Sequence, residues 1–188
     1  AGKITSNSYY VASLVGYHRW GTLNIYNCWS SVDIVCTKKT DNSFNAGFVG
    51  YSYDSNININ INNCRFDGSL QGAETGGCSG FVGQRNSNSS LMKISNCLFA
   101  PTQLTVATDN SYTFAYKSDV NTNNYYTTPL GKEQGTAIGN MTDSELLNKL
   151  GKGWEKKGDK VVPVFDIKNL STGSIECNTF WAYTGEDI

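Results

Sequence analysis

Four aromatic residues are the strongest candidates for a ligand-binding site. Tyr17 and Tyr51 each follow a glycine that recurs in the sequence, and Trp20 and Tyr53 lie close behind them. If copies of the repeat stack, these rings form a flat outward platform that can receive sugar rings or an apolar protein patch. The competing interpretation is that the rings cover a turn or a neighbouring part of a longer chain.

Carboxylates are the groups that a lyase or glycosidase would need, clustered on one outward face. Asp33 and Asp67 follow their repeat glycines, Gly16 and Gly50, at the same spacing. Counted from the repeat cysteine they differ, at +5 and +3, and Ala100 occupies the next equivalent position. We interpret both as scattered surface charge. With no catalytic constellation in the sequence, we expect a protein that is not an enzyme.

Other kinds of chemistry find little support. His18 is the only histidine, which excludes a His-rich metal site, and we interpret it as a lone surface residue. No phosphate loop, HExxH, GxSxG or Asp-x-Asp-x-Asp series occurs, so we expect no metal and no cofactor. A net charge of −1 gives no strong attraction to nucleic acid. No apolar run approaches the ~18 residues of a membrane span, so no membrane insertion is expected.

Two short elements recur along the chain and must position the aromatic residues. An apolar–Val–Gly element ends at Gly16, Gly50 and Gly83, which gives a period of about 33 residues. An Asn–Cys pair recurs at nearly the same interval, and its members are Asn27–Cys28, Asn63–Cys64 and Asn96–Cys97. Apolar residues alternate before each pair, which indicates strands within a repeat architecture.

The alternation reverses its parity just before each cysteine, and a continuous strand cannot do this. The residue at the reversal is always Asn, which tolerates the left-handed backbone of a bend. We therefore predict an all-β, right-handed parallel β-helix of about three to four coils. Stacking would make Asn27, Asn63 and Asn96 an internal hydrogen-bonded ladder, and Asn124–Tyr125 would carry the pattern into a degenerate fourth coil.

Six cysteines in a secreted chain would ordinarily suggest disulfides. Cys28, Cys64 and Cys97 share one inward repeat position, where bridging one pair would leave the third alone, so we expect free thiols. The other three, Cys36, Cys78 and Cys177, break the period, and an oxidised Cys36–Cys78 pair stays open.

The sequence changes character near Gly131, which suggests coils over residues 1–130 and a C-terminal cap over residues 131–188. Thr142 and Glu145 form a capping box before a short helix that ends at Gly151. With the strand at residues 160–165, this helix is expected to cover the last coil's unpaired edge. One or two further strands are expected around Ile175, Cys177, Phe180 and Trp181.

With these motifs in hand, the sequence resembles the GLUG-motif repeats of bacterial surface proteins, named for a Gly–Leu–apolar–Gly core. Gly47–Phe48–Val49–Gly50 and Gly80–Phe81–Val82–Gly83 match it with Phe for Leu, and Ser13–Leu14–Val15–Gly16 lacks only the first glycine. The ending over residues 150–164 is similar to the terminal cap of such proteins from gut Firmicutes. The likeness covers residues 13–165 and implies the solenoid fold and an extracellular setting, in adhesin-like and carbohydrate-associated proteins.

We therefore expect a non-catalytic domain of a cell-surface or secreted bacterial protein that acts in adhesion or ligand presentation. Its partner would be a host or bacterial glycan or glycoprotein, and the chain would be part of a longer polypeptide. The alternatives are a carbohydrate-binding module, part of a lyase or glycosidase β-helix, and a structural spacer.

Overall fold

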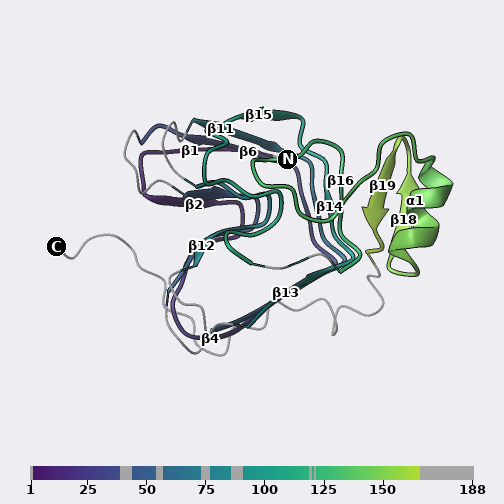
Figure 1. Cartoon of the computed structure of the whole chain (residues 1–188), viewed down its shortest axis with the longest axis horizontal. Coiled ribbons are helices and arrows are strands. Elements are labelled where there is room, and N and C mark those ends of the chain that lie inside the picture. The colour runs from purple at the N-terminus through teal and green to yellow at the C-terminus, as the bar shows by residue number, and fades with distance from the viewer. Residues whose placement is uncertain are drawn as a thin grey trace.

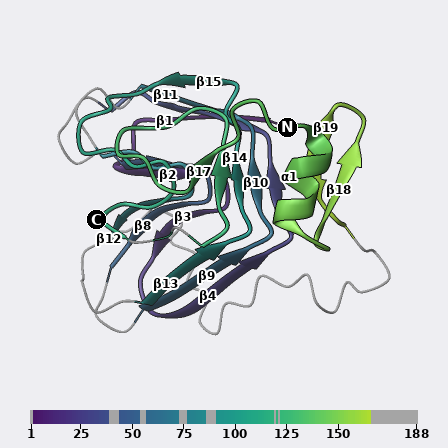
Figure 2. The same cartoon turned by 45° about the vertical axis from the view of Figure 1, so that its right-hand side comes forward.

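The chain folds as a parallel β-helix, as predicted. The computed structural model describes residues 2–38, 44–53, 57–72, 77–85, 91–118, 120 and 122–165. Each coil runs once round the same contour, and its strands lie beside their equivalents in the next coil (Figure 1, Figure 2). The further strands expected around Ile175 to Trp181 lie outside the described residues.

In the part of the chain that the structure describes, four coils and a final half-turn make up the solenoid. The first coil consists of β1 (Gly2–Ser6), β2 (Tyr10–Ala12), β3 (Val15–His18), β4 (Gly21–Tyr26) and β5 (Trp29–Ser30). The second consists of β6 (Val32–Cys36), β7 (Phe44–Ala46), β8 (Val49–Ser52), β9 (Ile57–Asn62) and β10 (Arg65–Phe66). The third contains β11 (Ser69–Gly72), β12 (Val82–Arg85), β13 (Leu91–Ser95) and β14 (Leu98–Phe99). The fourth contains β15 (Gln103–Thr105) and β16 (Tyr125–Tyr126), and β17 (Thr136–Ala137) follows.

Equivalent strands of successive coils pair in parallel, in the orders β1-β6-β11-β15, β2-β7, β3-β8-β12, β4-β9-β13 and β5-β10-β14-β16-β17. The pairing register follows the sequence repeat, because Val15 pairs with Val49 and Val49 with Val82. Like residues therefore lie on like residues, which is why the repeat is visible in the sequence.

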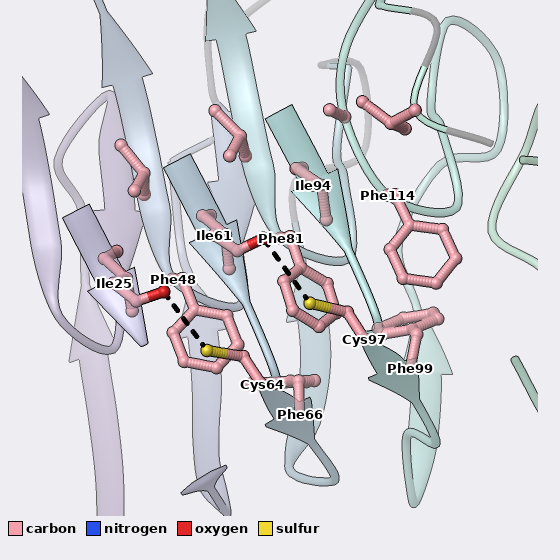
Figure 3. Packing of buried hydrophobic residues seen from close by; sticks show 14 of the residues in the cluster. Ile25, Phe48, Ile61, Cys64, Phe66, Phe81, Ile94, Cys97, Phe99 and Phe114 are labelled. Atoms are coloured by element: carbon pink, nitrogen blue, oxygen red, sulfur yellow. Dashed lines mark hydrogen bonds between the residues drawn. The ribbon is translucent and has the colours of Figure 1, made fainter. Parts of the chain in front are cut away.

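The core consists of columns of like side chains that run along the solenoid axis (Figure 3). Ile25, Ile61 and Ile94 form one column, and Phe48, Phe81 and Phe114 form another in which every ring is fully buried. The thiol of Cys64 donates to the carbonyl oxygen of Ile25 at 3.5 Å. The repeat cysteines are free thiols, as predicted, and Cys36 is a free thiol as well, so it forms no disulfide with Cys78.

The asparagine bend is also confirmed. The φ angles of Asn27, Asn63 and Asn96 are 53°, 52° and 52°, all in the left-handed region. The side chains bond along the stack, since the amide of Asn63 donates to Asn27 Oδ1 at 3.3 Å. The prediction that this ladder is internal is wrong, because the three side chains are half-buried at an outer corner. The parity reversal adds a second outward residue between two inward ones, and that residue is the asparagine.

In the fourth coil, the bend occurs one residue earlier than predicted. Asn123, with φ 53°, makes the bend, and its amide donates to Asn96 Oδ1 at 2.6 Å. Asn124 takes the position of the repeat cysteine, where its Oδ1 accepts from the backbone N–H of Cys97 at 3.0 Å. Tyr125 accordingly pairs with Leu98 rather than with the cysteine.

The repeat glycines are required by the backbone of the preceding coil. A Cβ atom at Gly83 would lie 2.1 Å from the carbonyl oxygen of Gly50, and one at Gly50 would lie 2.7 Å from that of Gly16. At Gly16, in the first coil, the nearest atom would be the carbonyl oxygen of Tyr10 at 3.5 Å, an ordinary contact. The same motif position therefore requires glycine only where another coil precedes it.

A helix and a hairpin follow the coils. Helix α1 (Asp143–Leu150) has the predicted capping box at Thr142, and β18 (Trp154–Lys157) pairs antiparallel with β19 (Lys160–Pro163). No helix in the described ranges is long and apolar enough for a membrane span.

These elements pack on the flank of the solenoid, so the prediction that they cover the last coil's edge is wrong (Figure 2). Their buried side chains pack against Leu98 of β14 and Tyr125 of β16. Apolar outward residues on these two strands direct the helix there. The packed residues of the helix and hairpin are Leu146, Leu150, Trp154 and Val161.

Alanine substitution of two equivalent glycines tests this account of the repeat. We expect Gly83→Ala to lower the free energy of unfolding by about 3 kcal/mol, because the new methyl group meets a backbone carbonyl that cannot move alone. Gly16→Ala should leave the stability nearly unchanged. Urea denaturation of both variants measures the difference, and equal losses would contradict the explanation.

Candidate functional site

The candidate site lies where β2 and β7 meet β3 and β8. The chain turns sharply between these strands, and the glycine motif lets them approach closely, since a Cβ at Gly50 would lie 3.0 Å from the backbone nitrogen of Val11. Tyr10 of β2 pairs with Phe44 of β7, and Tyr17 of β3 pairs with Tyr51 of β8. Two aromatic columns therefore face each other across this corner.

The rings of the two columns are stacked. The ring of Tyr10 lies 4.3 Å from that of Tyr51, with 16° between their planes. Tyr17 and Tyr51 stack at 5.5 Å and 19°, and Tyr53 extends the group at 6.2 Å from Tyr51. Such pairs hold one another in place and add about 0.5–1.5 kcal/mol each beyond the area that they bury.

Among the four residues predicted as a site, Tyr17, Tyr51 and Tyr53 are brought together. Tyr17 is 46% exposed and Tyr53 is 40% exposed, so both can contact a ligand. Tyr51 is only 7% exposed, which corrects the expectation that it forms part of an outward platform. The ring of Tyr10 covers it, and it serves to support the exposed rings. Trp20 is exposed and carries the Arg19 guanidinium 4.3 Å from its ring centre.

Sequence reasoning missed part of the site. A hollow of about 400 Å³ at this corner is lined by Tyr9, Tyr10, Phe44, Tyr51 and Gln84. Gln84 stands in register with Tyr51, so that an amide takes the third place of the tyrosine column. Tyr10 and Phe44 are separated in sequence by one repeat, and this was the signal that could have identified the pair.

The hydroxyl groups of Tyr10 and Tyr51 are neutral at physiological pH. Burial, and then the neighbouring tyrosines, raise the pKa of Tyr51 to about 12, and burial also raises the pKa of Tyr10. These phenols can therefore both donate and accept hydrogen bonds. The ammonium group of Lys38 lies 3.6 Å from the ring centre of Tyr9 and brings a positive charge to the rim.

Asp67 is a buried structural residue, which corrects its interpretation as surface charge. Its Oδ1 accepts from Trp29 Nε1 at 2.7 Å, and its Oδ2 accepts from Lys160 Nζ of β19 at 2.7 Å. Burial by itself raises the pKa of Asp67, but hydrogen bonds, above all that from Lys160, outweigh burial and lower it. Arg65 completes the network with an ion pair at 3.2 Å. The network joins the hairpin to the solenoid.

Asp33, the other candidate carboxylate, is exposed on β6, and it pairs in register with Ser69 rather than with Asp67. The shared spacing from the glycines therefore does not place the two carboxylates in one column. In the described part of the chain, no group of three or more His, Cys, Asp or Glu residues could hold a metal ion.

Comparison of the chain with protein-family profiles, with curated proteins and with solved structures finds no match. The geometry of the aromatic corner is therefore the basis for a functional proposal.

His18 is buried, which corrects its interpretation as a surface residue, and burial lowers its pKa below the ordinary value of 6.5. The unfolded chain consequently binds a proton more readily than the folded one, and the stability should fall as the pH drops below about 6.5. We expect His18→Phe to flatten the curve of unfolding free energy against pH between pH 7 and pH 5.

His18 is the only histidine, so no other imidazole titrates between pH 7 and pH 5. Asp67 titrates in a lower pH range. The contribution of Asp67, whose pKa is lowered, disappears below about pH 4, where the unfolded carboxylate takes up its proton. Urea titrations of the unmodified chain and of His18→Phe at several pH values provide the measurement. If the unfolding free energy changes equally with pH in both proteins between pH 7 and pH 5, the role of His18 is contradicted.

Proposed function

We propose that this chain is a non-catalytic binding domain of a bacterial cell-surface or secreted protein, and that the aromatic corner binds glycans. The observation that carries the proposal is the hollow lined by four aromatic rings and the amide of Gln84. Its volume of about 400 Å³ falls within the range of about 300–1,000 Å³ that is common for small-molecule sites.

The groups in the hollow suit a sugar chemically. A pyranose ring has apolar C–H faces, which pack on aromatic rings, and a rim of hydroxyls that need hydrogen-bond partners. The exposed rings of Tyr9 and Tyr17 provide apolar surface at the mouth of the corner. The neutral hydroxyl of Tyr10 and the amide of Gln84 provide donors and acceptors.

The scaffold suits recognition because it holds the rings rigidly. Tyr10 and Tyr51 sit on strands that pair with a neighbouring coil, and their rings stack at 4.3 Å. A preorganised site loses little conformational entropy when a ligand binds. The resemblance to GLUG-motif repeats supports the setting in a surface or secreted protein.

A binding role is favoured over hydrolysis by the residues that line the hollow. Glycosidases need two carboxyl groups that flank the scissile bond. None of the five lining residues is acidic, and the buried Asp67 is held by the hairpin network.

A glycan and mucin array tests the proposal with the folded chain and two variants. We expect Tyr9→Ala/Tyr17→Ala to weaken binding by at least about tenfold, or ~1.4 kcal/mol, because it removes the exposed rings at the mouth. Both rings are exposed, so folding should survive, and an unchanged thermal midpoint would confirm this. Phe165→Ala removes a strongly exposed ring that is not among the residues lining the hollow, and it serves as the matched control.

Binding that survives the double substitution would rule out the aromatic corner. Failure of the unmodified chain to bind any glycan would contradict the glycan proposal and leave the structural spacer as the better account. Turnover of a polysaccharide would favour the carbohydrate-active alternative.

A further inference from the structure

The two ends of the solenoid are built differently. At the C-terminal end, residues 130–138 run along the fourth coil and close it. There the side chain of Gln134 makes hydrogen bonds that the backbone of a further strand would make. Its Oε1 accepts from the backbone N–H groups of Phe114 and Ala115 at 2.9 and 2.8 Å. Its Nε2 donates to the carbonyl oxygen of Ala115 at 2.9 Å, and β17 pairs with β16. This end carries a built-in cap.

The N-terminal end has the features of an open edge. Within the described residues, each of the strands β1 to β5 is the terminal strand of its sheet. Proteins ordinarily protect such edges with lysines, prolines or bulges. These five strands contain no proline, and Lys3 is their only lysine or arginine.

One interior column, that of the repeat phenylalanines, also remains open at this end. Leu14 occupies the column of Phe48, Phe81 and Phe114, as shown by the pairing of Val15 with Val49. The three phenylalanines are fully buried, whereas Leu14 is 42% exposed. Repeat proteins normally place a polar capping unit at each end, and the first coil is not one.

We infer that this end binds a further coil of the same repeat, supplied by the same polypeptide on the N-terminal side of β1. Ser31 connects β5 of one coil to β6 of the next, and β6 pairs with β1. The path into β1 therefore comes from the column of β5, where a preceding coil would end. Such a coil would repeat an interface that the structure already contains between each pair of coils.

A second copy of the chain does not fit this end. If two copies met through their open ends, a two-fold axis would relate them, and the strands of the second copy would run in the opposite direction. The outline of its coil would also face the first as a mirror image. The outline is asymmetric, so the strands of the two copies would not lie over one another (Figure 1). The opposite end of the second copy is closed by residues 130–138 and Gln134. A single extended peptide could pair with one strand edge out of five. A coil of the same outline matches all five.

The test adds one coil to the intact chain. A copy of residues 68–101 placed directly before Gly2 has the correct register, because Gly68 and Gly2 are both equivalent to Val32. We expect backbone amide exchange in β1 and β4 to slow by about tenfold or more and the thermal midpoint to rise. The control carries the same copy with Phe81→Asp and Phe99→Asp within it, and it should give neither effect.

Gly16→Ala provides a second readout that a general stabilising effect would not reproduce. It should be tolerated in the chain as it stands, but should destabilise the extended chain, because the added coil brings a carbonyl oxygen against the new methyl group, as Gly50 does at Gly83. Unchanged exchange in β1 and β4, or tolerance of Gly16→Ala in the extended chain, would overturn the inference. So would a stable dimer of the unextended chain that Leu14→Asp dissociates.

Discussion

Every coil of this protein depends on its neighbours for its backbone hydrogen bonds. Among the described residues, the strands pair in parallel with those of the preceding and following coils, except in the antiparallel hairpin on the flank. A coil therefore has no stable conformation alone, and its neighbours fix its outline. Because like residues lie on like residues, the residue at a given position of the repeat meets the same surroundings in every coil. This explains the recurrence of the asparagine bend and of the close-packed glycine.

The departures from the repeat occur where the stack ends or where it is joined to something else. Asn124 replaces the repeat cysteine in the fourth coil and bonds back to Cys97. Gln134 supplies, through its side chain, the bonds that a fifth strand would make with its backbone. Asp67 and Lys160 attach the hairpin to the side of the solenoid. Each is a single polar residue that satisfies groups which regular stacking would leave without partners.

The aromatic corner follows from the same constraint. Close approach of β8 to β2 requires the repeat glycine Gly50, and it places one aromatic column opposite another. The rings then stack across the corner, and a hollow remains beside them. A rigid solenoid with a preorganised aromatic hollow on its side suits recognition of an extended ligand such as a glycan.

The sequence by itself determined what repeats along the chain. Its period, alternation and asparagines predicted the strands, the bends, the stacking of Tyr17 on Tyr51 and the free repeat thiols, because stacking translates sequence spacing directly into contact. Only the tertiary structure decided which side chains of different strands and faces meet. Tyr10 covers Tyr51, and the hairpin lies on the flank over Leu98. The burial of Asp67 likewise depends on a lysine distant in sequence. These contacts depend on the angle between strands and on packing between remote segments, which a period of about 33 residues does not encode.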